Sequence, residues 1–217
     1  MIQDQAKDFG KSLTSFRMCL DWCDSFGFKL FECLIYRKSG AEGAWWNTRF
    51  RVDHEYMHVF LKGHKPQYFN KECIKVKSKH AGLLRVGATD RKTDGTTIKS
   101  NPMIINDVKC PGTVWEYVGA GDGSKAKHEH PATYPDKLPY DFIQCFCPPG
   151  GLVLDPFMGS GSTALASKAS KRYFIGFDIA QEYVDLANRR LLEDLRTYQN
   201  KMREWMSREP PVFDFVS

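Results

Sequence analysis

A glycine-rich turn after a short apolar run constrains the fold of this chain more than any other feature of its sequence. The apolar run at residues 152–154 predicts a buried strand, and Gly159 and Gly161 predict a sharp turn, after which a helix begins. A second strand is predicted over residues 173–178 and ends in Asp178. A strand, a glycine turn and a helix in this order are typical of the site where an open α/β sheet binds a nucleotide-like ligand.

The spacing of Asp178 from the turn suits an acid that contacts a ribose hydroxyl. The third glycine of the dinucleotide fingerprint is missing from the turn, which argues against an enzyme that uses a nicotinamide cofactor. A glycine turn by itself still leaves open an unrelated protein with a Rossmann-type sheet.

Three motifs in the C-terminal half of the chain resemble those of one known family in both order and spacing. Residues 155–163, Asp-Pro-Phe-Met-Gly-Ser-Gly-Ser-Thr, resemble the cofactor loop of the S-adenosylmethionine-dependent DNA amino-methyltransferases, which modify N6 of adenine or N4 of cytosine. Residues 173–191 are similar to the next segment of that family, and residues 130–139 to its other cofactor-contacting segment. The order fits the permuted subgroup, in which the cofactor loop lies near the C-terminus.

This resemblance implies a binding site for S-adenosylmethionine. Glycine at 159 and 161 lets the backbone approach the amino-acid end of the cofactor, and the N-terminus of the following helix suits its carboxylate. Asp178 suits both ribose hydroxyls as an acceptor, and Ile179 and Tyr183 can flank the adenine. The expected contacts are His130, Pro131, Ala132, Asp155, Pro156, Phe157, Gly159, Ser160, Gly161, Thr163, Asp178, Ile179 and Tyr183.

The fold that the resemblance implies is α/β, with a Rossmann-like methyltransferase sheet that is mostly parallel and carries an antiparallel hairpin. We expect a single domain with a helix and hairpin (1–63), a basic insertion (64–114), a cofactor-binding half (115–206) and a tail (207–217). Apolar patterns predict the hairpin strands over 28–36 and 54–61, and helices over 12–25, 139–146 and 181–205.

Residues 64–101 are basic and rich in Gly, Ser and Thr, with poor apolar periodicity. By position they correspond to the variable target-recognition segment of the related enzymes, and a basic, loop-rich stretch suits contact with the phosphates and grooves of double-stranded DNA. A solvated surface insertion is the alternative, and the net charge of +5 permits either. The candidate nucleic-acid contacts are Lys71, Lys75, Lys77, Lys79, Arg85, Arg91 and Lys92.

The motif that carries methyl transfer in this family, an Asp, Asn or Ser followed by Pro-Pro and an aromatic residue, is not in the sequence. The Pro-Pro pairs at 148–149 and 210–211 have the wrong neighbours. The motif belongs upstream of the hairpin, and we expect that the chain begins too late to contain it, so the residues that act on the base stay unassigned. The strands between the cofactor strand and the hairpin are then missing too, and the sheet is expected to be incomplete.

We therefore expect a site-specific DNA methyltransferase that uses S-adenosylmethionine. Its form stays open between a fragment that needs a second chain carrying the missing motif and a homo-oligomer. A catalytically silent module that binds the cofactor or DNA is the first alternative. A methyltransferase that acts on RNA or on a small molecule is the second, and the basic insertion argues mildly against a small substrate.

Seven cysteines are scattered along the chain, and Cys145 and Cys147 have no second pair at zinc spacing. We expect buried, reduced thiols and no metal. No signal peptide and no membrane-spanning run are recognised, so a cytoplasmic protein without a membrane partner is expected.

Overall fold

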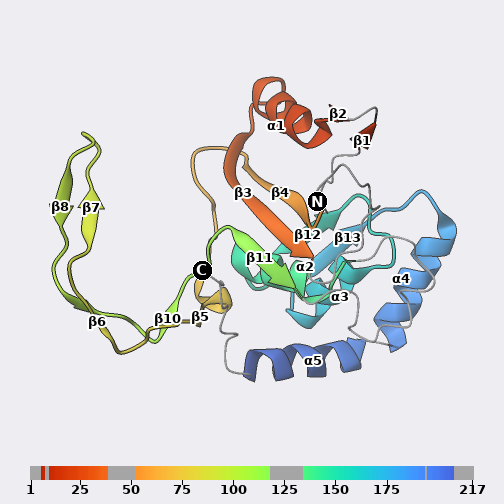
Figure 1. Cartoon of the computed structure of the whole chain (residues 1–217). Helices are drawn as coiled ribbons and strands as arrows, with labels where there is room; N and C mark the ends of the chain where they lie inside the picture. Colours follow the sequence, from red (N-terminus) through yellow and green to blue (C-terminus); the bar gives the residue numbers. More distant parts are fainter. Residues whose placement is uncertain (1–5, 8–9, 39–51, 118–133, 194, 208–217) are drawn as a thin grey trace.

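The computed structural model describes residues 6–7, 10–38, 52–117, 134–193 and 195–207. Figure 1 shows an α/β body from which a long two-stranded arm projects. Near the N-terminus a short pair of strands, β1 (Ala6–Lys7) and β2 (Gly10–Lys11), precedes the first helix, α1 (Thr14–Asp24).

One sheet of the body contains the predicted hairpin. Strand β3 (Lys29–Lys38) pairs with β4 (His54–Leu61) in antiparallel register, and β11 (Val114–Tyr117) adds to the other side of β3 in parallel. Helix α1 contacts this sheet through aromatic pairs, Phe16 with Tyr56 and Trp22 with Phe60. Most side chains of the helix are nevertheless exposed.

A second sheet contains the glycine turn. Strands β12 (Leu152–Asp155) and β13 (Tyr173–Gly176) are parallel, and α3 (Ser162–Ala169) connects them, as the sequence predicts. Among the described strands, each pairs only with the other. One face of the pair is open to solvent, since Leu152 and Leu154 are 60% and 61% exposed, and Tyr173 and Ile175 opposite them are exposed too.

Helix α2 (Lys137–Phe146) packs between the two sheets. Its residue Leu138 belongs to a cluster with Leu34 and Met57 of the hairpin. Its residues Tyr140 and Ile143 belong to a second cluster with Leu165 of α3. The helix therefore joins two parts of the body that no described backbone ladder connects.

The long C-terminal helix predicted over 181–205 is wrong, because the structure has two helices, α4 (Gln181–Glu193) and α5 (Leu195–Ser207), with different directions (Figure 1). Their buried faces have different partners. Leu186 and Ala187 of α4 face the glycine turn and α3, whereas Tyr198 and Met202 of α5 join the cluster around α2. One straight helix could not reach both.

The basic segment is also more ordered than its composition predicts. After a short 3₁₀ turn, η1 (Glu72–Ile74), the chain runs out and back as a β-ribbon, with the pairs β5 (Val76–Lys77) with β10 (Val108–Lys109), β6 (Leu84–Arg85) with β9 (Met103–Ile104), and β7 (Thr89–Arg91) with β8 (Thr97–Lys99). Nearly all side chains from residue 82 to 99 are exposed, so this part of the ribbon needs no strong apolar alternation, which explains the weak pattern in the sequence.

All seven cysteines are free thiols, but the expectation that they are buried holds fully only for Cys145, while Cys33 and Cys73 are exposed. The described residues contain no group of three or more His, Cys, Asp or Glu side chains that could hold a metal ion. Within the same ranges no helix is long and apolar enough to cross a membrane.

Candidate cofactor site

The turn between β12 and α3 is held by hydrogen bonds from its own backbone. The carboxylate of Asp155 accepts the N–H of Phe157 at 3.0 Å, and the N–H of Met158 donates to the carbonyl of Phe177 at 2.9 Å. Gly159 and Gly161 have φ values of 49° and 80°, which lie in the left-handed region. These positions favour glycine on conformational grounds alone, before any ligand is considered.

Asp178 fixes this turn to the end of the second strand. One carboxylate oxygen accepts the N–H of Gly159 at 2.9 Å, and the other accepts the N–H of Ala180 at 3.0 Å. Each carboxylate oxygen can accept a further hydrogen bond, so the side chain is held in place and can still bind hydroxyl groups. The acid that the sequence singles out is therefore brought next to the glycine turn.

Gly161 has a second structural role. A Cβ atom added there would lie 2.7 Å from the Cβ of Ala187 on α4, which is closer than carbon atoms pack. Helix α4 thus presses directly on the start of α3. From the sequence, Gly161 is predicted to let the backbone approach a ligand. The structure adds a second reason for glycine at this position, which is the close packing of Ala187 against it.

A buried ion pair contacts the backbone of the turn, and its residues are absent from the candidates predicted from the sequence. Arg190 is 5% exposed, and it donates to the carbonyl of Ser160 at 2.6 Å and pairs with Asp136 at 3.5 Å. The hydroxyl of Ser162 also donates to Asp136 at 3.0 Å. The sequence pattern could have predicted this residue, because the helical spacing of Arg190 from Leu186 and Ala187 places the arginine on the buried face of α4.

The segment upstream of α2 reaches the same turn. The hydroxyl oxygens of Tyr134 and Thr163 lie 2.8 Å apart in a hydrogen bond, and burial raises the pKa of Tyr134 to about 12. This contact joins the upstream motif to α3. The other expected contacts of that motif, His130, Pro131 and Ala132, lie outside the described residues.

The remaining candidates divide into exposed and packed side chains. Phe157 and Ile179 are 87% and 103% exposed and stand at the carboxyl ends of the two strands, beside Asp178. Pro156 is also exposed, whereas Ser160 is buried against Arg190. Two apolar side chains next to a fixed carboxylate are suited to a ligand with a flat ring and a sugar. Ser160 is part of the support instead.

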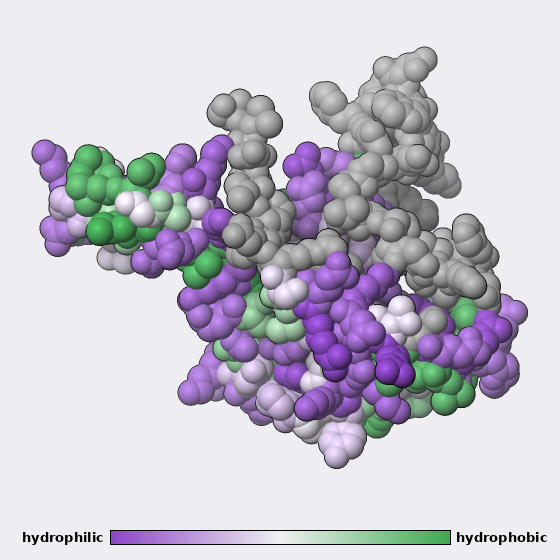
Figure 2. Space-filling view, turned by 90° about the horizontal axis from the view of Figure 1, so that it is seen from below, coloured by the Kyte–Doolittle hydropathy of each residue, from purple (hydrophilic) through white to green (hydrophobic). Residues whose placement is uncertain are grey.

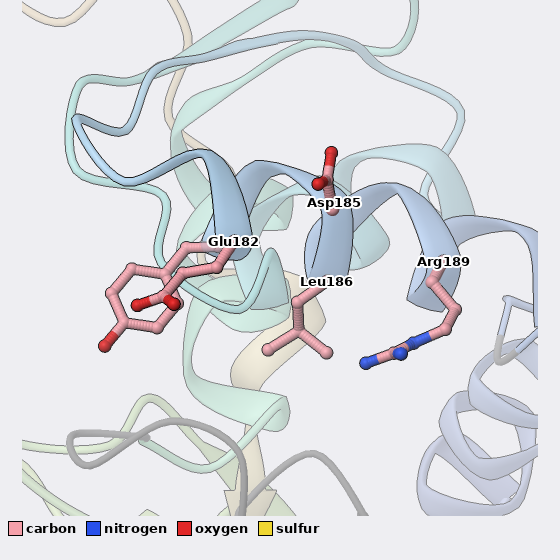
Figure 3. Close-up of a pocket in the computed structure, with 5 residues that line it drawn as sticks. Glu182, Asp185, Leu186 and Arg189 are labelled. Atoms are coloured by element: carbon pink, nitrogen blue, oxygen red, sulfur yellow. The ribbon is translucent and has the colours of Figure 1, made fainter.

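A shallow pocket lies on α4 and is lined by Glu182, Tyr183, Asp185, Leu186 and Arg189. In Figure 3, Leu186 and Arg189 point to one side of the helix and Asp185 points to the other. Of the expected cofactor contacts, this lining includes Tyr183 alone among the described residues. The pocket therefore does not by itself mark the candidate cofactor site, which the sequence predicts at the glycine turn and Asp178.

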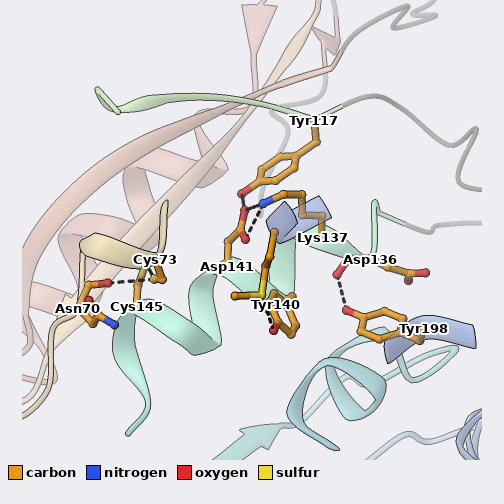
Figure 4. A network of polar contacts seen from close by, with 10 residues as sticks. Asn70, Cys73, Tyr117, Asp136, Lys137, Tyr140, Asp141, Cys145 and Tyr198 are labelled. Carbon is orange, nitrogen blue, oxygen red and sulfur yellow. Dashed lines mark hydrogen bonds and ion pairs between the residues drawn. The ribbon is translucent and has the colours of Figure 1, made fainter. Parts of the chain in front are cut away.

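A polar network next to the site ties α2 to the first sheet (Figure 4). Tyr117 of β11 donates to Asp141 at 3.0 Å, and Lys137 donates to both oxygens of the same carboxylate at 2.7 and 2.5 Å. Burial raises the pKa of Asp141, against the opposing effect of Lys137, and raises the pKa of Tyr117 further above its ordinary value. Asp136, in the same view, accepts from Ser162 at the start of α3, so this group of contacts extends to the glycine turn.

The candidate nucleic-acid contacts fall into two groups. Lys71 and Lys75 flank the η1 turn on the body, where Lys75 pairs with Glu72 at 2.5 Å. The others lie on the arm that starts at Val76, namely Lys77, Lys79, Arg85, Arg91 and Lys92. The structure thus separates the lysines of the body from the cations of the ribbon.

A family model described as a DNA methylase matches residues 4–189. The chain is 30% identical over 195 residues to the orphan methyltransferase M.BamHII of Bacillus amyloliquefaciens, covering 88% of this chain and 72% of that protein. It is 34% identical over 133 residues to the DNA adenine methyltransferase YhdJ of Escherichia coli strain K12, covering 61% of this chain and 42% of that protein.

Two solved structures share the fold. A PvuII DNA methyltransferase described as cytosine-N4-specific aligns over 92% of this chain and 66% of its own length, with a TM-score of 0.64 and 19% identity. A complex of M1.HpyAVI with S-adenosylmethionine aligns over 82% of this chain and 70% of its own, with a TM-score of 0.53 and 24% identity. The predicted Rossmann-like methyltransferase fold is confirmed, and the chain spans only part of each of these proteins.

Proposed function

Because the chain belongs to the DNA methylase family, whose members use S-adenosylmethionine, we propose that it binds this cofactor at the turn between β12 and α3 and forms part of an enzyme that methylates N6 of adenine or N4 of cytosine in double-stranded DNA. The observation that carries the proposal is Asp178, whose carboxylate is fixed by Gly159 and Ala180 beside two exposed apolar side chains.

The described residues fit each end of this cofactor. The first turn of α3 has no side-chain cap, so its N–H groups are available to a carboxylate at the positive end of the helix. Asp178 can accept from the ribose hydroxyls, and Phe157 and Ile179 can cover the adenine. The bound cofactor supplies an electrophilic methyl group, so the protein mainly has to position it against the amino nitrogen of an unstacked base.

The second part of the proposal concerns the open sheet. Neither β12 nor β13 pairs with β3, β4 or β11 among the described strands, and the apolar face of β12 and β13 is exposed. We propose that further strands, in a second polypeptide or a longer form of this one, complete the sheet and bring the motif that holds the target base. The chain covers 72% of the length of M.BamHII and 66% of the length of the PvuII enzyme, and this difference in length supports the proposal.

Calorimetric titration of the chain with S-adenosylmethionine tests the cofactor site. Binding that is weakened by about 1–3 kcal/mol in Asp178→Ala and unchanged in Glu182→Ala supports the assignment, because Glu182 is an exposed acid on the nearby helix α4. Absence of binding by the unaltered chain at millimolar cofactor contradicts it.

Translation of the coding DNA upstream of Met1 in all frames tests the proposal that further strands complete the sheet. An Asp-, Asn- or Ser-Pro-Pro-aromatic motif found there should be expressed together with this chain, and transfer of a labelled methyl group to mixed-sequence duplex DNA should then appear. Cofactor binding without transfer, in a monodisperse monomer whose amides at 151–179 resist hydrogen exchange, would favour the silent binding module.

A further inference from the structure

Two cysteines that lie far apart in the sequence meet where η1 rests on α2. The sulfur atoms of Cys73 and Cys145 are 3.6 Å apart, which is close enough for a thiol hydrogen bond, and no covalent bond joins them (Figure 4). The two residues are 72 positions apart in the chain. A flexible chain rarely brings such distant residues together, so their contact is a product of the fold.

The backbone on both sides of this thiol pair is held by other contacts. The N–H of Asn70 donates to the carbonyl of Cys145 at 2.8 Å. The rings of Phe69 and Phe146 stack with centroids 5.3 Å apart, and Phe31 of β3 packs edge-on against both rings. A disulfide needs a distance of about 2.05 Å between its sulfur atoms, so the two thiols have to approach by about 1.5 Å.

The two thiols differ in exposure and in acidity. Cys73 is exposed, whereas Cys145 is 0% exposed, so a dissolved oxidant reaches Cys73 first. A hydrogen bond from the thiol of Cys145 lowers the pKa of Cys73. The same hydrogen bond and burial raise the pKa of Cys145, which therefore stays a thiol. Because the thiolate is the nucleophile, Cys73 is the residue that reacts with an outside reagent.

We propose that Cys73 and Cys145 form a reversible redox site, in which a peroxide oxidises Cys73 and Cys145 then closes a disulfide between η1 and α2. The thiolate of Cys73 attacks one oxygen of hydrogen peroxide, the O–O bond breaks, and hydroxide leaves, which gives a sulfenic acid. The sulfur of Cys145 then attacks the sulfur of Cys73, and the S–O bond breaks as water leaves with the proton of Cys145. Two thiols and one peroxide thus give one disulfide and two waters, and a dithiol reductant reverses the reaction.

The bridge would restrain the base of the arm. Strand β5 begins at Val76, three residues after Cys73. The strands of the arm contact mainly one another, and Figure 2 shows the arm standing away from the body. A bond from Cys73 to α2 ties the start of the arm to the helix that packs between the two sheets. Oxidation should therefore reduce local opening of residues 70–78.

Peroxide treatment of the reduced full chain, followed by denaturation, alkylation with N-ethylmaleimide and peptide mapping, tests the site. With two of the seven thiols in the bridge, the chain should take up five maleimide groups, and dithiothreitol should restore the uptake of seven. The linked peptides should be those that hold Cys73 and Cys145. A bridge between other cysteines, such as Cys19 and Cys23 of α1, or uptake of seven groups after peroxide, would overturn the proposal.

Two serine variants that lie two positions apart provide a matched control. Cys145→Ser should abolish the bridge and leave Cys73 as a sulfenic acid that dimedone traps, whereas Cys147→Ser should keep the bridge. Equal bridging by the two variants would contradict the proposal. Cys33 is also exposed, but partial burial of its thiol raises its pKa. In the unaltered native chain, Cys73 should therefore react with N-ethylmaleimide at least about tenfold faster than Cys33, and equal rates would contradict its role.

The unaltered chain also allows a test that needs no variant. In guanidinium chloride the same dose of peroxide should give at least about tenfold less of the bridge between Cys73 and Cys145, because the fold no longer closes the long loop. Equal yields in buffer and in denaturant would show that the native contact does not direct the reaction. In buffer, hydrogen exchange of residues 70–78 should be slower by about threefold or more in the oxidised form. Unchanged exchange in this segment would overturn the restraint on the arm.

Discussion

Gly161 and Ala187 touch so closely that a methyl group added at Gly161 would lie 2.7 Å from the Cβ of Ala187. Gly161 also has a φ of 80°, which disfavours any residue with a Cβ. Two separate effects therefore keep glycine at this position, one from the backbone and one from helix α4. A bulky substitution here disturbs the packing of α4 as well as the approach of a ligand.

Gly161→Ala should lower the free energy of unfolding by about 2–4 kcal/mol, since the left-handed backbone and the overpacked contact each contribute. Ala187→Gly alone should cost about 1 kcal/mol through helix propensity. The double variant should lose less than the sum, because removing the Ala187 methyl group relieves the contact and leaves only the backbone strain. Urea unfolding of the four proteins measures this coupling, and strict additivity would show that the contact is not made.

Asp178→Ala should weaken the binding of S-adenosylmethionine by about 1–3 kcal/mol, which is the range for losing hydrogen bonds to a charged group. The same change removes the acceptor for the N–H of Gly159, so the turn should also exchange its amide hydrogens faster. Calorimetry and hydrogen exchange measure the two effects. Faster exchange with unchanged affinity would leave Asp178 a purely structural residue.

Arg190→Met should destabilise the protein by about 3–5 kcal/mol, because it leaves Asp136 buried without its cation. The neighbouring Arg189 is exposed, and Arg189→Met should change the stability by about 0.5 kcal/mol or less. The two variants remove the same charge one position apart. Similar unfolding free energies for both would mean that the ion pair with Asp136 does not support the turn.

The raised pKa of Asp141 predicts a dependence of stability on pH. Burial favours its protonated form, so the folded protein holds this proton to a higher pH than the unfolded chain does. The contribution of Asp141 to the free energy of unfolding is therefore complete below the ordinary carboxyl pKa of about 4. It is lost as the pH rises through the raised pKa of the folded protein. Relative to Asp141→Asn, the native chain should lose stability over this range.

Unfolding free energies of the native chain and of Asp141→Asn, measured from acid to neutral pH, give this difference directly. Lys137→Met removes the cation that opposes the effect of burial, so it should move the loss to higher pH. A difference that grows in favour of the native chain with rising pH would show that the ion pair with Lys137 outweighs burial.

The sequence by itself determined the elements that local patterns encode. The glycine turn, its flanking strand and helix, and the hairpin of β3 and β4 follow from apolar runs and from residues that break them, and the structure confirms each. The family resemblance added the prediction that the segment upstream of α2 contributes to the same site. Tyr134 then proved to contact Thr163, which joins the two motifs in space.

Only the tertiary structure decided how these elements meet. The separation of α4 from α5, the parallel pairing of β11 with β3, and the ion pair of Asp136 with Arg190 depend on contacts between residues far apart in the chain. No local period encodes such contacts. The same holds for the arm, where only the pairing of two strands distant in sequence shows which residues lie opposite one another. A strand pattern gives alternation, and its pairing partner decides which side chains share a surface.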